Sequence, residues 1–191
     1  MNYCSNCGQP VSLAIPEDDD RERHICRHCD TIHYQNPRII TGCLPIYDDG
    51  HEPRVLLCKR AIEPRYGKWT LPAGFMENGE TAEQGAAREC WEEARAKVSI
   101  GDLYNMTSIP NVNQVHLFFM ATLDKPEFAS GPESLEVELL KEADIPWDEI
   151  SFTAVKVTLQ NYFRDRANGQ FPLRSGWAGP NEWGEWHWNK H

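Results

Sequence analysis

The sequence predicts an α/β domain preceded by a small module that a metal ion holds together. Strand-like runs bounded by Pro, Gly or Asp, together with two amphipathic helices, indicate a mixed sheet with helices packed on it. Two C-x2-C motifs near the N-terminus indicate the metal-held module. The chain has 191 residues, 40% of them hydrophobic, which suits one ordinary core plus a satellite rather than two full domains.

The paired C-x2-C motifs have the spacing of a four-thiolate zinc site. An ion bound by all four sulfurs would pin together about 35 residues that are too few to hold a core unaided. Disulfides are the alternative, but nothing in the sequence suggests an oxidising compartment. The module also lacks the basic face of a nucleic-acid reader, so we expect a structural role. The predicted zinc ligands are Cys4, Cys7, Cys26 and Cys29.

The strands and the second helix come from the rest of the chain. A helix is predicted from about residue 152 to 167, with Val155, Leu159, Tyr162 and Phe163 on its apolar side. The strand-like runs are 39–47, 54–60, 115–123 and 135–140. The remaining cysteines lie in apolar contexts and are expected in the core: Cys43, Cys58 and Cys90.

The first helix is predicted to begin at Thr81, where Thr81 and Gln84 have the form of a capping box. Apolar residues then recur at helical spacing, which predicts the buried stripe, and three glutamates are expected to share a different face. The predicted stripe is Ala87, Cys90, Trp91 and Ala94, and the glutamates are Glu89, Glu92 and Glu93.

Two interpretations of these glutamates are open. A solvated helix would pair Arg88 with Glu92 and Glu93 with Lys97, each pair contributing about 0.2 to 0.5 kcal/mol. A metal site is favoured by the loop in front, "LPAGFMENGE", because its tight turns can present a main-chain carbonyl near Gly74 to the ion that the carboxylates hold.

The stretch from Gly74 to Ala96 resembles the Nudix box, G-x5-E-x7-R-E-U-x-E-E-x-G-U, where U is aliphatic. The resemblance implies an α/β/α sandwich with a mixed sheet. It also implies that Glu89, Glu92 and Glu93, with Gly74, bind Mg²⁺ or Mn²⁺, and that Glu80 and Arg88 support the reaction. Arg95 departs from the box, which has glycine there, so the helix either ends on a left-handed non-glycine residue or continues.

The resemblance also extends to particular groups of Nudix enzymes, which differ in their substrates. A zinc ribbon before a Nudix domain is similar to the NADH pyrophosphatases, but their S-Q-P-W-P-F-P-x-S stretch is absent. Residues 38–167 look more like the plant plastid FAD and ADP-ribose pyrophosphatase and its bacterial relatives. This resemblance implies hydrolysis of ADP-ribose, FAD or both to AMP and a second phosphate product. The alternatives are an NADH or NAD pyrophosphatase, and a Nudix-fold sensor that binds nucleotide without cleaving it.

Further residues are candidates for substrate contact and proton transfer. Nudix enzymes often carry a general base on a loop after the box, and here Glu133 and Glu136 are favoured over Glu138. Basic side chains could clamp a diphosphate and aromatic ones could stack on a base, although Trp69 is equally suited to the core. The substrate candidates are Arg60, Arg65, Tyr66 and Trp69.

Charge and hydropathy narrow the class of partner. The formal net charge of -10 argues against a nucleic-acid backbone as partner, and an anionic substrate would need a cation as intermediary. The sequence shows neither a leader peptide nor an apolar run of roughly 18 residues, so we expect a cytoplasmic protein without a membrane partner.

The predicted division of the chain is a zinc ribbon at 1–35, a Nudix domain at 36–168 and a Trp-rich tail at 169–191. The tail shows no helical or strand period. Because four exposed indoles would be unusual, we expect them to pack on the domain or on a second subunit, which makes a homodimer a candidate assembly. These are Trp177, Trp183, Trp186 and Trp188.

Overall fold

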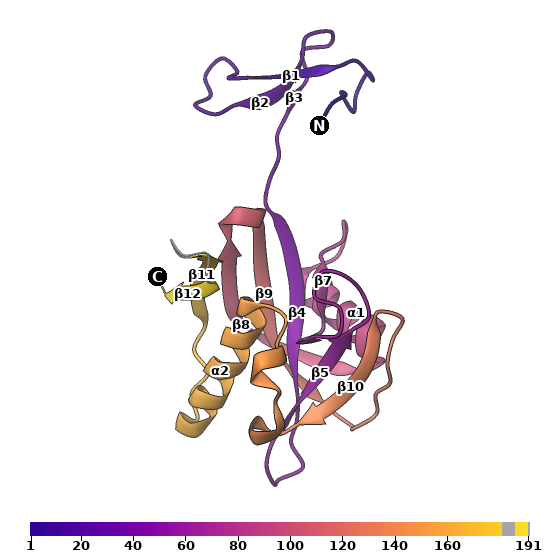
Figure 1. Ribbon diagram of the computed structural model, residues 1–191, viewed down its shortest axis with the longest axis vertical. Coiled ribbons are helices and arrows are strands. Elements are labelled where there is room, and N and C mark those ends of the chain that lie inside the picture. Colours follow the sequence, from indigo (N-terminus) through magenta and orange to yellow (C-terminus); the bar gives the residue numbers. More distant parts are fainter. Residues whose placement is uncertain (181–185, 191) are drawn as a thin grey trace. The chain divides into compact units, whose positions relative to one another are not determined.

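The computed structural model describes residues 1–180 and the backbone of residues 186–190. Contacts divide the chain into two units, Met1–Pro37 and Arg38–His191. The first unit is a three-stranded antiparallel sheet of β1 (Val11–Ala14), β2 (Arg23–Cys26) and β3 (Ile32–His33) (Figure 1). Four cysteine sulfur atoms lie within 4.8 Å of one another. This confirms the predicted cluster of Cys4, Cys7, Cys26 and Cys29.

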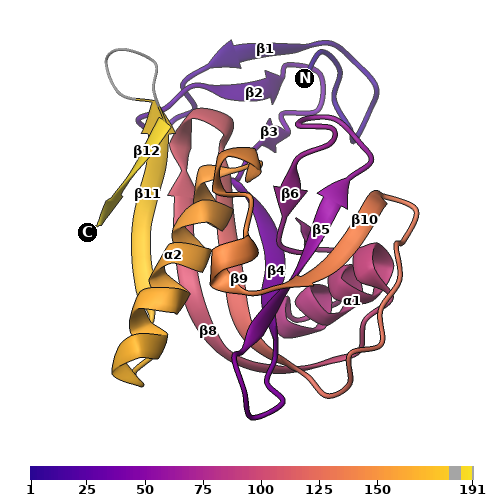
Figure 2. The same ribbon diagram turned by 60° about the horizontal axis from the view of Figure 1, so that its bottom comes forward.

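The second unit is built on a mixed nine-stranded sheet (Figure 2). β4 pairs parallel with β9, and β8 pairs parallel with β11, while the other pairs are antiparallel. In spatial order its strands are β10 (Ser134–Leu140), β5 (Arg54–Arg60), β4 (Arg38–Tyr47), β9 (Gln114–Leu123), β8 (Val98–Ile109), β11 (Arg174–Pro180) and β12 (Trp186–Lys190). Off this path, β6 (Trp69–Thr70) pairs with β5 and β7 (Ala73–Phe75) pairs with β4.

The four strand-like runs of the sequence are confirmed as β4, β5, β9 and β10. β8 was missed because it contains Gly101, Asp102 and Asn105, residue types that are depleted in strands. The tail shows no strand period in its sequence, yet β11 and β12 within it extend the sheet. Trp177 lies in β11 and is partly buried, whereas Trp183 and the side chains of Trp186 and Trp188 lie outside the described residues.

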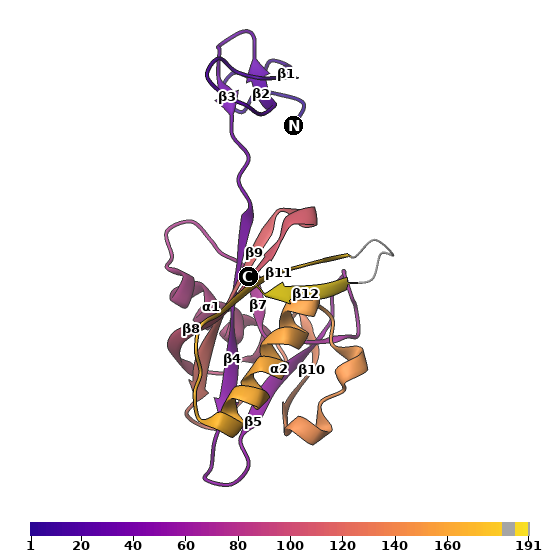
Figure 3. The same cartoon turned by 90° about the vertical axis from the view of Figure 1, so that its left-hand side faces the viewer.

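Helices α1 (Ala82–Ala94) and α2 (Thr153–Asn168) cover opposite faces of the sheet (Figure 3). Successive side chains of a strand point to opposite faces. Cys43 of β4 accordingly packs in one cluster with Cys90 of α1, while the next residue, Leu44, packs in the other with Leu159 of α2. This arrangement is the α/β/α sandwich that the sequence predicted.

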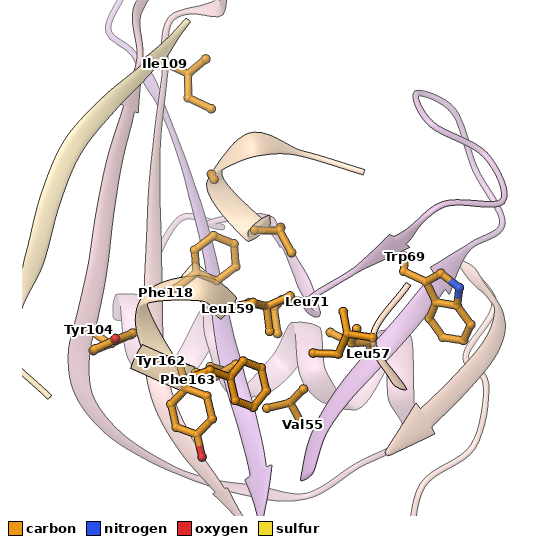
Figure 4. Packing of buried hydrophobic residues seen from close by; sticks show 14 residues of the cluster. Val55, Leu57, Trp69, Leu71, Tyr104, Ile109, Phe118, Leu159, Tyr162 and Phe163 are labelled. Carbon is orange, nitrogen blue, oxygen red and sulfur yellow. The ribbon is translucent and has the colours of Figure 1, made fainter. Parts of the chain in front are cut away.

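The cluster beneath α2 is the larger of the two and contains most of the buried aromatic rings (Figure 4). Val155, Leu159, Tyr162 and Phe163 are each at most 4% exposed, as the predicted apolar side of this helix requires. Trp69 is also in this cluster at 6% exposure, so the core assignment holds for its side chain.

Three short 3-10 helices complete the described chain: η1 (Pro110–Val112), η2 (Glu142–Asp144) and η3 (Trp147–Glu149). Among the described residues, no helix has the length and apolar character needed to cross a bilayer.

Candidate active site

Helix α1 begins and ends at the residues that the sequence indicated. The Thr81 hydroxyl accepts a hydrogen bond from the Gln84 amide at 3.2 Å, and the Gln84 side chain accepts one from the Thr81 amide at 2.8 Å, so the capping box is confirmed. The helix ends at Arg95 in the left-handed conformation, with φ 49°. The structure therefore selects the first of the two alternatives for Arg95.

The predicted faces of α1 need correction. Trp91 is 44% exposed and Ala87 is only partly buried, whereas Glu89 and Glu93 lie on the buried side with Cys90. Only Glu92 of the three glutamates is exposed. The buried stripe predicted from apolar periodicity was partly wrong because two carboxylates occupy the inward face of the helix. Burying carboxylates is costly unless they serve a polar site.

Arg88 connects three of the charged positions of the box by hydrogen bonds. Its Nε and one terminal nitrogen donate to the two oxygens of Glu80 at 3.0 and 2.8 Å, and the other terminal nitrogen donates to Glu89 at 2.7 Å and Glu92 at 3.0 Å. The Arg88 guanidinium, with the Glu77 amide, lowers the pKa of Glu80 to about 2. Arg88 thereby holds Glu89 and Glu92 in fixed positions.

Glu93 has no such partner. Its side chain is 5% exposed, and its Oε2 has no hydrogen-bond partner among the described residues. Burial, and then the neighbouring Glu89 carboxylate, raises the pKa of Glu93 to about 8. Burial also raises the pKa of Glu89. The Glu93–Lys97 pair of the alternative, solvated-helix interpretation is not among the ion pairs of the described residues, and Lys97 lies over the ring of Trp91 at 5.9 Å.

The loop before α1 approaches these carboxylates closely. A Cβ on Gly74 would lie 2.4 Å from Oε1 of Glu89, so any larger residue at this position would have to displace the Glu89 carboxylate. The unpartnered Glu93 oxygen, the buried Glu89 and the adjacent backbone make a set of hard oxygen ligands that fits a divalent cation. Among the described residues, the ligand atoms of the four cysteines are the only His, Cys, Asp or Glu group found within 4.8 Å of one another. Glu89 and Glu92 are instead hydrogen-bonded to Arg88.

These groups lie at a cavity of about 1050 Å³ within the second unit. It is lined by Gly74, Arg88 and the three glutamates of the box, Glu89, Glu92 and Glu93, and by the predicted Arg60, Arg65 and Glu133. Tyr66 is 57% exposed and is not among the lining residues. Glu136 is also elsewhere, paired with Lys59 at 2.9 Å, and this geometry favours Glu133 of the two base candidates.

Other lining residues carried no signal in the sequence, because isolated residues from separate segments meet only in the fold. Arg38 lies over the ring of Phe75 at 4.9 Å, and the ring of Phe152 lies 5.3 Å from the guanidinium of the predicted Arg60. His116 is 8% exposed and hydrogen-bonded to Gln114, and burial lowers its pKa to about 4. The cavity thus combines cations, aromatic faces and a neutral imidazole.

Family comparisons agree with both units. Residues 2–35 match the Nudix N-terminal zinc-ribbon family, and residues 36–173 match the NUDIX domain. The chain belongs to the Nudix hydrolase family. Its fold is similar to the crystal structure of a NUDIX hydrolase from Nitrosomonas europaea, with 51% identity, a TM-score of 0.88, and coverage of 93% of this chain and 98% of that one.

Curated relatives of this Nudix hydrolase share about a third of its residues. NAD-capped RNA hydrolase NudC of Edwardsiella ictaluri is 35% identical over 74% of the chain and 50% of the relative, and the Salmonella typhi protein of that name is 32% identical over 75% and 53%. The chain therefore spans about half the length of these relatives. The NUDIX domain of Shewanella oneidensis NrtR, solved with ADP ribose, is 17% identical with a TM-score of 0.57 over 69% of this chain and 90% of that one, which shows the fold alone.

Proposed function

We propose that this Nudix hydrolase is a divalent-cation-dependent pyrophosphatase that cleaves the diphosphate of a nicotinamide adenine dinucleotide. The observation that carries the proposal is the placement of buried Glu89 and Glu93 at a cavity of about 1050 Å³. That volume is at the upper end of the usual range for ligand pockets and suits a dinucleotide. The products would be AMP and nicotinamide mononucleotide.

The choice of nicotinamide substrate rests on the relatives. Those at 32 to 35% identity are named for an NAD-containing substrate. The expectation of ADP-ribose or FAD has weaker support, since the neighbours whose titles name ADP-ribose are 16 to 18% identical. The missing S-Q-P-W-P-F-P-x-S stretch is the argument on the other side.

We assign three roles to the residues of the site: cation binding, orientation of the carboxylates and proton transfer. Glu89 and Glu93, supported by Glu92 and the Gly74 backbone, would hold the cation, which supplies charge neutralisation and Lewis acidity at the diphosphate. Arg88, itself held by Glu80, orients Glu89 and Glu92 through the hydrogen bonds described above. Glu133 faces the same cavity and would accept the proton of the attacking water.

A free dinucleotide fits this chain better than a capped RNA. The net charge of -10 opposes the approach of a phosphate backbone, whereas a single dinucleotide meets the cations that line the cavity. We therefore propose that turnover depends on the dinucleotide and gains little from an attached RNA.

A hydrolysis panel with product identification tests the proposal. NADH, NAD⁺, ADP-ribose, FAD, nucleoside triphosphates and NAD-capped RNA are compared by kcat/KM with Mg²⁺ or Mn²⁺. We expect NADH or NAD⁺ to exceed ADP-ribose and FAD by at least about tenfold, a ratio that a few pocket contacts can provide. A preference for FAD or ADP-ribose would restore the interpretation from the sequence. Binding of ADP-ribose without hydrolysis of any compound would favour a sensor.

A further inference from the structure

The first turn of α2 opens into the same cavity as the glutamates. Phe152 is its N-cap and provides no side-chain cap, and the first turn contains no acidic residue. The amide of Lys156 is the first to bond within the helix, to the carbonyl of Phe152 at 3.0 Å. The amides of residues 153–155 have no hydrogen-bond partner in the described part of the chain. Such a helix end carries partial positive charge and attracts anions.

An unpaired hydroxyl lies immediately before this turn. Ser151 lines the cavity and is 7% exposed, and its Oγ has no hydrogen-bond partner among the described residues. Its backbone is held in place, since the Ser151 amide donates to the carbonyl of Trp69 at 2.8 Å. A buried hydroxyl without a partner is unfavourable, and an anionic oxygen in the cavity would satisfy it.

Two cations flank the turn. Lys156 lines the cavity, as does Arg60, whose guanidinium lies 5.3 Å from the ring centre of Phe152. Neither forms an ion pair with any described residue. Arg60 therefore lies at the start of α2 and lines the same cavity as Glu93.

We propose that the first turn of α2, with Ser151 and Lys156, binds the phosphate group that leaves with the departing half of the substrate. This assignment rests on the proposed pyrophosphatase function. Amide N–H groups, a hydroxyl and an ammonium are the donors that phosphate oxygens accept from. Arg60 lies against Phe152 at this turn and lines the same cavity as Glu93, so it can contact the second of two linked phosphates.

In the proposed hydrolysis, negative charge develops beside the first turn of α2. The oxygen of water forms a bond to the phosphorus beside the glutamates, and the bond from that phosphorus to the bridging oxygen breaks. The bridging oxygen keeps the electron pair and leaves as part of the second phosphate, while one proton of the water passes to Glu133. The leaving phosphate gains negative charge, and the amides of α2, the Ser151 hydroxyl and the Lys156 ammonium stabilise it.

A binding experiment tests the site without any substrate. Inorganic phosphate is titrated into the full-length, ¹⁵N-labelled protein in the absence of added divalent cation, and the amide resonances of residues 153–155 are followed. We expect saturable shifts there, with affinity lowered by roughly tenfold in Lys156→Met and to a smaller extent in Ser151→Ala. Lys125→Met, on an exposed loop, is the matched control. Absence of shifts at these amides, or equal affinity in Lys156→Met and the control, would overturn the site.

Kinetics test the role in the reaction, using whichever dinucleotide the panel identifies. We expect Lys156→Met to lower kcat by roughly tenfold with a smaller change in KM, and Lys156→Arg to recover part of the loss, because the contact strengthens as the phosphate leaves. Phosphate binding with unchanged kcat in Lys156→Met would overturn the leaving-group assignment. If the panel finds no hydrolysis, the proposed function fails, and the phosphate titration still decides whether the anion site exists.

Discussion

The amide of Gly131 donates a hydrogen bond to the carbonyl of Glu93 at 2.9 Å, and the amide of Ala129 donates to the carbonyl of Ala94 at 2.9 Å. The loop that carries Glu133 is therefore attached to the C-terminal end of the helix that carries the glutamates. Its other end is held by the Ala61 amide, which donates to the carbonyl of Glu133 at 2.8 Å. These bonds fix the position of the candidate base relative to Glu93.

Gly131→Ala should displace this loop. A Cβ at Gly131 would lie 1.8 Å from the carbonyl oxygen of Glu92, so the backbone has to move. Because a displacement of about 1 Å can cost about a hundredfold in rate, we expect kcat to fall by roughly that factor with a smaller change in KM. Ser130→Ala, at an exposed neighbour in the loop, is the control. Unchanged kcat in Gly131→Ala would show that the loop does not position the base.

Glu93→Gln should lower kcat by at least about a hundredfold, because it removes a charge proposed to hold the cation. Without added cation its free energy of unfolding should exceed that of the wild type by an amount that grows as the pH rises from about 4.5 to about 8, because the folded wild type must take up a proton at Glu93 that the unfolded chain does not hold. Mn²⁺ affinity, followed by electron paramagnetic resonance, should fall as well. Glu127→Gln, at an exposed site, serves as the control, and near-normal turnover in Glu93→Gln would refute the cation assignment.

The sequence specified the parts of the fold whose signals are local. The C-x2-C spacing, the Thr81 capping box and four of the strands could be recognised because each depends on residues close together in the chain. β8, β11 and β12 could not, because their place in the sheet comes from pairing with distant strands rather than from strand propensity.

The residues of the candidate site were likewise predictable only where they belong to one continuous motif. The Nudix box is one continuous motif, so the sequence predicted its glutamates together with Arg88. It misplaced Trp91, because hydrophobic periodicity takes no account of carboxylates that face inward for a polar site. It also missed Ser151, Phe152 and Lys156, since nothing in that segment distinguishes a helix start at a cavity from one at the surface.

Removing zinc should affect the first unit alone. A chelator, or the double variant Cys4→Ser/Cys7→Ser, leaves residues 1–37 without the ion that replaces a hydrophobic core, so amide signals of β1 to β3 should collapse to random-coil positions. The second unit has its own core and should retain its dispersed signals. Elemental analysis should find about one zinc per chain. Protein without zinc but with an ordered first unit would contradict the metal assignment.

His116 should make stability depend on pH. Burial lowers its pKa from 6.5 to about 4, so between these values the unfolded chain binds a proton that the folded chain does not. The free energy of unfolding should therefore fall as the pH drops through this window, by about 3 kcal/mol in total. Urea denaturation at several pH values compares the wild type with His116→Asn, which lacks this component. Equal pH dependence in the two proteins would contradict the buried, neutral imidazole.

The final prediction concerns the attachment of β11 to α2. The Asp165 side chain is 3% exposed, and it accepts hydrogen bonds from Nε of Arg174 at 3.1 Å and from the hydroxyl of Tyr104 at 2.8 Å. Arg174→Met leaves this carboxylate buried without its main cation, so the free energy of unfolding measured in urea should fall by about 3 to 5 kcal/mol.

Adding Asp165→Asn to Arg174→Met should recover most of that loss, because the buried charge is then removed together with its partner. The single variant Asp165→Asn provides the remaining corner of the double-mutant cycle. A loss below about 1 kcal/mol in Arg174→Met would match an exposed pair and would show that Arg164, which lies 3.7 Å from Asp165, can replace Arg174. A large loss that the double variant does not reverse would instead mean that Arg174 acts through packing of its aliphatic stem.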